Sequence, residues 1–225
     1  MSYQNFKRFP QKKEPEPTEY FLYKPYVGTG NNNPPQEIKD KIVRIAKLLE
    51  SHGYLLRTGG MDGPEDIFEK AVQLKEIILP WKGFANKDSK LTYNSPSAQG
   101  IAKLYHDNYD KMKLPVQAFL AKNVRLLYGD KLKSPALFMI CWSEDGAETL
   151  REKTMRTGSV GHAIQIAYSM RIPIFNLGKP DTEDRLKRYL DLDNQGAFTG
   201  PVIKREREPV RENTHVQEEI QELNF

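Results

Sequence analysis

The sequence has one cysteine, no long apolar run and a low share of apolar residues. Cys141 is the single cysteine in 225 residues, so an internal disulfide framework and a cysteine-rich metal site are both excluded. No stretch approaches the roughly 20 consecutive apolar residues of a membrane-spanning helix. Residues 1–17 also carry no apolar run of the kind that marks a secretory signal. We therefore expect a soluble, cytoplasmic protein with no membrane segment.

The sequence also lacks a strong charge bias and a metal-binding pattern. It has 34 basic and 30 acidic residues, which give a net charge of +4. A dedicated nucleic-acid binder usually carries a larger and more clustered basic excess, so the charge allows a phosphate-bearing ligand without requiring one. No histidine or cysteine cluster has metal-ligand spacing, and no Ser-His-Asp order stands out. We predict no metal and no cofactor.

Both ends of the chain are too polar to form a packed core. Residues 1–19 contain three prolines and no periodicity, which predicts a flexible N-terminal arm. Residues 201–225 mix basic and acidic residues with little apolar content, so chain-ordering entropy favours a disordered C-terminal tail. A short partner-binding helix at 216–223 is the alternative there. Residues 20–200 are left as one domain.

Apolar runs and helical periodicity alternate along this domain. Four isoleucines and leucines, Ile38, Ile42, Ile45 and Leu49, fall on one helical face. The run at 136–142 is continuously apolar and suits a central parallel strand. Strands are predicted at 20–27, 54–58, 76–79, 136–142 and 172–177, and helices at 36–51, 64–74, 97–107, 115–127 and 159–170. The alternation predicts an α/β fold: a Rossmann-like, doubly wound, mostly parallel sheet flanked by helices.

Two glycine-containing loops follow the first two strands, where such sheets bind ligands. Residues 27–35 combine two glycines with three asparagines, and suit either ligand contact or an ordinary turn and helix cap. Residues 57–66 place three glycines before a helix N-terminus, which suits phosphate or ribose. Neither loop has the spacing of a Walker A or dinucleotide motif. Glu65 and Asp66 either complement the helix dipole or face ribose hydroxyls or an oxocarbenium-like centre, and Asp62 is expected to cap the helix.

Two later loops offer further contacts. Around residues 156–162 a Gly-Ser-Val-Gly turn enters a helix, where backbone N–H groups and two hydroxyls can bind an anion. His162 falls inside that helix and is interpreted as structural. At 80–84, Trp81 and Lys82 can stack on a base and neutralise a phosphate, or can form part of an apolar lid. His106, alone in a helical segment, carries little weight.

These loops supply the candidate site residues. The catalytic candidates are Glu65 and Asp66. The ligand-binding candidates from the loops are Gly28, Thr29, Asn31, Arg57, Gly59, Gly60, Asp62, Trp81, Lys82, Thr157, Gly158 and Ser159, together with Trp142 from the loop at 142–146.

A series of short motifs carries a family resemblance. Residues 59–68 read Gly-Gly-Met-Asp-Gly-Pro-Glu-Asp-Ile-Phe, and residues 79–84 read Leu-Pro-Trp-Lys-Gly-Phe. They are followed by His106-Asp107, Lys122-Asn123, Cys-Trp-Ser-Glu-Asp-Gly at 141–146, Thr-Gly-Ser-Val-Gly-His-Ala at 157–163 and Ile-Pro-Ile-Phe-Asn-Leu at 172–177. Over about residues 20–178 this series resembles the DprA/Smf family of the SLOG superfamily, and more closely the small DprA-like proteins of bacteriophages.

The resemblance implies a nucleotide-like or single-stranded DNA ligand, a link to DNA recombination and, for a phage protein, the host cytoplasm. The resemblance also adds Asn123 to the ligand-binding candidates. Two family arginines are replaced: Gly30 stands where an arginine follows the first Gly-Ser/Thr, and Lys122-Asn123 replaces Arg-Asn. No winged-helix extension is visible. The superfamily also contains LOG-type phosphoribohydrolases, so hydrolysis of a nucleotide N-glycosidic bond is an alternative, as is a sponge for a nucleotide second messenger. Whether the chain is an enzyme, and whether it forms a homo-oligomer, are left open.

Overall fold

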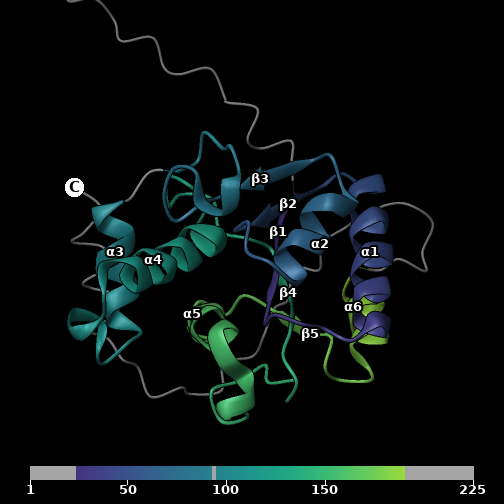
Figure 1. The fold of residues 1–225 in the computed structure, drawn as a ribbon. Coiled ribbons are helices and arrows are strands. Elements are labelled where there is room, and N and C mark those ends of the chain that lie inside the picture. The colour runs from purple at the N-terminus through teal and green to yellow at the C-terminus, as the bar shows by residue number, and fades with distance from the viewer. Residues whose placement is uncertain (1–23, 93–94, 191–225) are drawn as a thin grey trace, which may run out of the picture.

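The computed structural model describes residues 24–92 and 95–190, which form a five-stranded sheet with helices on both faces (Figure 1). The strands are β1 Lys24–Gly30, β2 Tyr54–Thr58, β3 Lys75–Ile77, β4 Met139–Trp142 and β5 Ile174–Asn176. They lie in the order β3-β2-β1-β4-β5, and every neighbouring pair is parallel. The predicted α/β Rossmann-like fold is confirmed.

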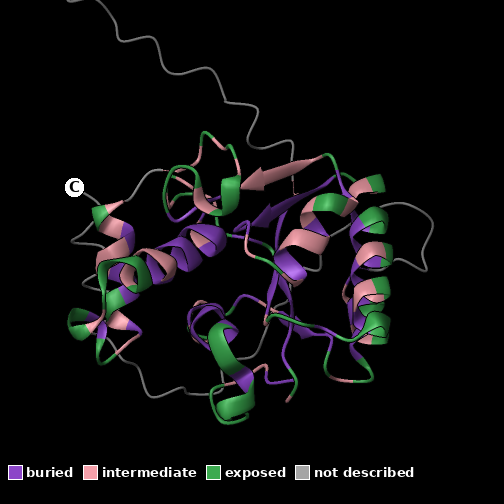
Figure 2. Cartoon of the chain, viewed as in Figure 1, coloured by how far each residue is buried: buried purple, intermediate pink, exposed green. Residues whose placement is uncertain are grey.

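The helices divide between the two faces of the sheet. One face is covered by α1 Gln36–Ser51, α2 Pro64–Ala71 and α6 Thr182–Leu190, and the other by α3 Pro96–Leu104, α4 Leu114–Tyr128 and α5 Gly161–Ser169 (Figure 1). Side chains alternate along a strand. In β1, Tyr26 therefore packs into the core on the side of α1, α2 and α6, and Val27 packs into the core on the side of α3, α4 and α5. Figure 2 shows burial concentrated in the strands and on the inward sides of the helices.

The strand order reverses between β1 and β4, and this reversal positions the site. From β1 the chain winds outward through β2 and β3, then returns to add β4 and β5 on the other side. Loops leaving β1 and β4 therefore separate to opposite faces, which opens a crevice at their carboxyl ends. The backbone N–H of Asn31 still donates to the Trp142 carbonyl at 3.0 Å, so the two strands stay paired up to the mouth of the crevice.

Helix α2 packs unusually close to β1. A Cβ at Gly28 would lie 2.7 Å from Cγ of Phe68 and 2.8 Å from Cδ1 of Leu56, so only glycine fits under this helix. Gly28 thus serves the packing of α2 in the structure. The close approach brings the first turn of α2, with Glu65, to the carboxyl end of β1.

Most predicted elements lie where the sequence indicated, and the differences are local. Helix α1 has the predicted bounds, whereas α2 ends at Ala71 and β4 begins at Met139. The prediction that Asp62 caps α2 was wrong. Gly63 is the N-cap residue, and no side chain makes a capping hydrogen bond at this end of the helix. Helix α6 was not predicted. The N-terminal arm at 1–19 and the C-terminal tail at 201–225 lie outside the described residues, as does the predicted strand start at 20–23.

The remaining described elements are short. They are the 3₁₀ turns η2 Phe84–Asn86, η3 Tyr109–Lys111 and η4 Met155–Val160. Within residues 24–92 and 95–190, none of the helices has the length and apolar character needed to cross a membrane.

Candidate functional site

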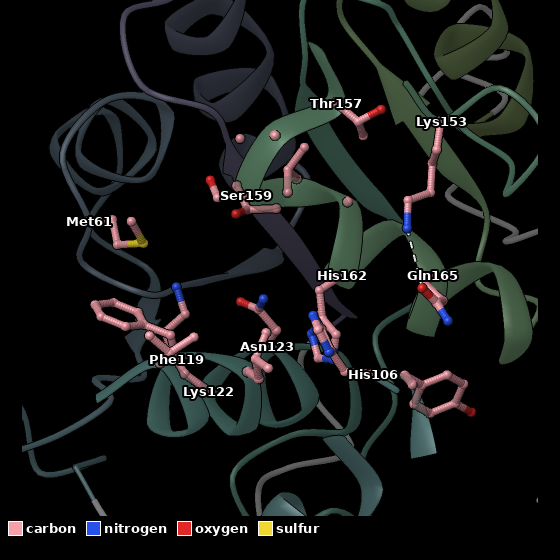
Figure 3. Close-up of a pocket in the computed structure, with 18 of the residues that line it drawn as sticks. Met61, His106, Phe119, Lys122, Asn123, Lys153, Thr157, Ser159, His162 and Gln165 are labelled. Carbon is pink, nitrogen blue, oxygen red and sulfur yellow. Dashed lines mark hydrogen bonds between the residues drawn. The ribbon is translucent and has the colours of Figure 1, made fainter. Parts of the chain in front are cut away.

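A cavity of about 560 Å³ opens at the carboxyl end of β1 (Figure 3). It is bounded by Thr29 and Gly30 of β1, by Glu65 of α2, by the segment that joins α3 to α4, by α4 itself, and by η4 with the start of α5. Small-molecule sites usually measure about 300–1,000 Å³, so the cavity has room for a ligand of nucleotide size. It lies in the crevice that the strand order creates.

The walls of the cavity differ in chemistry. Helix α4 and the segment before it contribute an apolar wall of Met112, Val116, Phe119 and Leu120. The opposite wall is polar and is formed by η4 and α5, with Thr157 and Ser159 among its residues. A ligand with one flat apolar part and one polar part matches this division.

A buried ion pair forms the floor between the walls. Lys122 Nζ lies 2.9 Å from Oε1 and 3.2 Å from Oε2 of Glu65, and both side chains are almost fully buried. The Glu65 carboxylate also accepts hydrogen bonds from the Thr29 hydroxyl at 2.8 Å and the Met61 N–H at 2.9 Å. Gly59 lies against the pair, and a Cβ there would collide with both charged groups. The pair therefore ties β1, α2 and α4 together beneath the cavity.

The Asn31 side chain fastens the β1 loop to the polar wall. Its amide donates to the Thr157 carbonyl at 2.7 Å and the Arg156 carbonyl at 3.2 Å, while its oxygen accepts from the Ser159 hydroxyl at 3.2 Å and the Val160 N–H at 3.1 Å. Gly158 has a φ of +58° and touches this amide. Asn31 thus uses both halves of its amide to hold η4 in place.

A second cluster of hydrogen bonds supports η4 from the β4 side. The Asp145 carboxylate accepts from the hydroxyls of Ser143, Thr154 and Thr157 at 2.5–2.7 Å, and from the backbone N–H groups of Thr154 and Ala147 at 3.2 Å. Although partial burial opposes ionisation, the hydroxyl hydrogen bonds hold the pKa of Asp145 well below its ordinary value. The ionised carboxylate orients Thr157, which lines the cavity.

Three aromatic rings form a cluster next to the apolar wall. Trp81, Phe84 and Phe119 meet edge to face with ring centroids 5.1–5.3 Å apart. Phe119 belongs to the cavity wall, and Trp81 is 39% exposed beside it. The loop at 80–84 therefore extends the apolar wall outward.

The structure brings some of the candidate residues together and separates others. Six of them line the cavity: Thr29, Glu65, Asn123, Thr157, Gly158 and Ser159. Asn31 and Gly59 support the walls from outside the cavity lining. Trp81 borders the cavity through Phe119.

The other candidates lie away from the lining. Arg57 is buried and bonds to Glu76 at 2.7 Å and to Ser134 in the loop before β4. Asp66 pairs with Lys70 and Lys87 at 2.6 and 3.1 Å. Trp142 packs into the core on the side of α1, α2 and α6. Gly28 lies under α2, Gly60 lies against Leu79 and Lys87, and Asp62 and Lys82 are exposed.

Several lining residues were not among the candidates chosen from the sequence. Lys122, Lys153, Tyr105 and Phe119 reach the cavity from segments with no loop motif, and His106 and His162 meet there with ring centroids 6.3 Å apart. A cation at position 122 was visible in the Lys-Asn pair, but its carboxylate partner lies 57 residues earlier. Among the residues that the structure describes, no group of three histidine, cysteine or acidic side chains could hold a metal ion.

Comparison with known proteins identifies no family for this chain. No family model matches the chain, and no curated protein matches it. Among solved structures, the chain is similar to DNA processing protein A from Helicobacter pylori, a protein described for its single-stranded DNA binding mode. The two are 16% identical with a TM-score of 0.43, over 98% of this chain and 94% of the other. At this level the similarity leaves the ligand of the present chain to be inferred from its own site.

Proposed function

We propose that this chain binds a phosphate-bearing nucleotide in the cavity, either free or as one unit of single-stranded DNA. The observation that carries the proposal is the pairing of an apolar wall on α4 with a polar, glycine-containing turn at the start of α5. A nucleotide has the same division into a flat base and a charged phosphate.

The polar wall suits the phosphate. Helix α5 begins at Gly161 with its N-terminal end at the cavity, and helix N-termini favour anions through their backbone N–H groups and dipole. The Ser159 hydroxyl and the Lys153 ammonium line the same wall. Glu65, the buried carboxylate in the lining, is neutralised by Lys122 and does not oppose an anion.

The apolar wall suits the base. Phe119 presents an aromatic ring that belongs to the cluster with Trp81 and Phe84. Stacking of a base on an aromatic side chain contributes about 1–3 kcal/mol and depends little on base identity. We therefore expect little preference among the bases.

The hydrolase alternative depends on Glu65, because Asp66 pairs with lysines outside the cavity lining. The Glu65 carboxylate already accepts from Thr29, Met61 and Lys122, which supports an organising role over acid–base chemistry. A link to DNA recombination, an origin in a phage and a sponge role stay predictions of the family resemblance, as does a homo-oligomer.

The experiment compares thermal unfolding with deoxynucleoside 5′-monophosphates, the matching nucleosides and short deoxythymidine oligonucleotides. A ligand that binds the folded state stabilises it by about 2.7 kcal/mol at a hundredfold excess over Kd. We expect the phosphorylated ligands to raise Tm and the nucleosides to do so less. Phe119→Ala and Ser159→Ala should each weaken the effect, whereas Ser51→Ala on α1 should not. If neither mononucleotides nor oligonucleotides raise Tm, the proposed function is wrong.

A further inference from the structure

His162 occupies the end of the cavity where α5 begins. It is 8% exposed and lies beside His106 (Figure 3). Its Nε2 is 3.5 Å from the Ala102 carbonyl, which can only accept, so this contact is a hydrogen bond when the ring carries its proton on Nε2. Nδ1 is buried and has no hydrogen-bond partner within the described residues. His162 therefore combines a place in the cavity lining with one buried, unsatisfied ring nitrogen.

Lys153 approaches the same helix turn. Its Nζ lies 3.2 Å from Oε1 of Gln165, a neutral amide oxygen, and among residues 24–92 and 95–190 no carboxylate forms an ion pair with it. The lysine stem runs over Gly161, where a Cβ would lie 3.2 Å from Lys153 Cε. Burial lowers the pKa of Lys153, which means that its ammonium gains less from solvent than an exposed lysine does. An anion in the cavity would compensate for that loss.

His106 adds a third donor. Its Nδ1 accepts the backbone N–H of Asn108 at 3.3 Å, so neutral His106 carries its proton on Nε2. His106 also lines the cavity. Three nitrogen-bearing side chains from three separate segments therefore line the cavity, and the two imidazole rings lie 6.3 Å apart at the start of α5.

We propose that Lys153, His162 and His106 form an oxyanion subsite that holds a phosphoryl group, and that His162 takes up one proton when the anion binds. The proton comes from solvent and adds to Nδ1, so the imidazolium donates from Nε2 to Ala102 and from Nδ1 to an oxygen of the anion. No covalent bond forms or breaks. The inference rests on the proposed nucleotide function only for the identity of the ligand.

The surroundings keep His162 neutral while no anion is bound. Burial lowers its pKa to about 4, the Ala102 carbonyl opposes this, and the charges of His106 and Lys153 lower it further. The other titratable groups that line the cavity are Tyr105, the exposed Asp107 and the mutually neutralised Lys122–Glu65 pair. A dianion beside Nδ1 supplies the opposite charge and raises the pKa of His162. Because the bound state then holds an extra proton, anion affinity rises as the pH falls from 8 to 6.

Sulfate tests the subsite, since it is a dianion throughout this pH range whereas phosphate monoesters titrate near pH 6. The histidine ring resonances of the full chain are followed by NMR during sulfate titrations at pH 6 and pH 8. If bound sulfate raises the pKa of His162 to about 7, affinity should be about tenfold higher at pH 6. His162→Asn should reduce the pH dependence, and the part that remains belongs to His106 in the same subsite. Lys153→Met should weaken binding at both pH values, and Lys133→Met, an exposed lysine before β4, should change neither.

The outcomes separate this inference from the proposed function. Unmoved His162 resonances, or equal sulfate affinity in Lys153→Met and Lys133→Met, overturn the subsite. The subsite is also overturned if neither Lys153→Met nor His162→Asn weakens nucleotide binding. That result would leave the proposed nucleotide function standing. If sulfate behaves as expected and nucleotides do not bind, the subsite stands and the proposed function fails. Lys153 is only partly buried, so Lys153→Met keeps the test available if His162→Asn does not fold.

Discussion

At the scale of single residues, the Glu65–Lys122 pair is the most demanding feature of the site. Each charged side chain loses its solvation on burial, and the pair offsets this only because several donors converge on one carboxylate. Thr29 and Met61 supply two of those hydrogen bonds and Lys122 supplies the rest. The pair holds three elements in register under the cavity, so its effect on ligand binding is one of positioning.

Removing the charge of Glu65 should therefore destabilise the fold. Glu65→Gln leaves the Lys122 ammonium buried without a counter-charge, and breaking a buried pair in this way typically costs about 3–5 kcal/mol. We expect the urea midpoint to fall with little change in the m-value.

The matched control removes both charges. Glu65→Gln combined with Lys122→Met takes away the unpaired ammonium, so we expect the double variant to be more stable than Glu65→Gln alone. A double-mutant cycle gives the coupling energy. Additive effects of the two substitutions would show that the pair does not couple α2 to α4.

The same residues show what the sequence could and could not predict about the site. The glycine, threonine and serine positions were visible because strand–helix turns of a parallel sheet share one edge. Thr29, Gly158 and Ser159 were found in this way. The role of Lys122 was not visible, because pairing with Glu65 depends on α2 and α4, from opposite faces of the sheet, meeting at the carboxyl end of β1. Arg57 looked like a loop residue, but its side chain is buried by the segment before β4.

At the scale of elements, η4 depends on polar contacts more than on apolar burial. Four of its six residues are exposed, and the turn contains Gly158 in a non-helical conformation. Asn31 holds it from the β1 side and Asp145 from the β4 side. The polar wall of the cavity is therefore built by hydrogen bonds to two side chains.

Acid should weaken this element through Asp145. Because the folded-state pKa of Asp145 lies below the ordinary value of 3.8, its contribution to stability is present above about pH 4 and is lost as the pH falls below it. Asp145→Asn should lower stability at pH 7 by about 1–3 kcal/mol, a typical loss for hydrogen bonds to a charged group. The difference from wild type should shrink below pH 4, measured as urea midpoints. Asp40→Asn, an exposed change on α1, should show no such trend. A difference that stays constant down to pH 2 would contradict the assignment.

The elements themselves differ in how clearly the sequence encodes them. Helix α1 could be predicted to the residue because a full apolar stripe faces the core. Helix α6 was missed because its nine residues are mostly charged and only Thr182, Leu186 and Leu190 are buried. Those three positions are spaced four apart, which is a helical pattern. Many solvent-exposed segments show a pattern that is equally weak. Asp62 was a plausible cap by residue type, yet Gly63 takes the position with a φ of +88°.

At the scale of the whole molecule, the sheet order indicates where a ligand binds and the net charge indicates how strongly a polyanion is attracted. The order β3-β2-β1-β4-β5 provides one crevice at the carboxyl edge, and the cavity lies in it. The net charge of +4 is too small to attract a long polyanion strongly by itself. We infer that affinity comes from one nucleotide unit in the cavity and little from an extended basic surface.

The salt dependence of oligonucleotide binding tests this inference. Each phosphate neutralised on a single strand contributes about −0.7 to the slope of log K against log salt. One or two phosphates in the cavity therefore predict a slope between about −0.7 and −1.4, measured with a deoxythymidine oligonucleotide by fluorescence anisotropy at several salt concentrations. Lys153→Met should make the slope shallower by roughly one phosphate contact, and Lys133→Met should leave it unchanged. A slope of about −4 or steeper corresponds to six or more phosphates. That number cannot fit into a cavity of about 560 Å³, so such a result would mean that the strand follows the outer surface and that the cavity is not its main binding site.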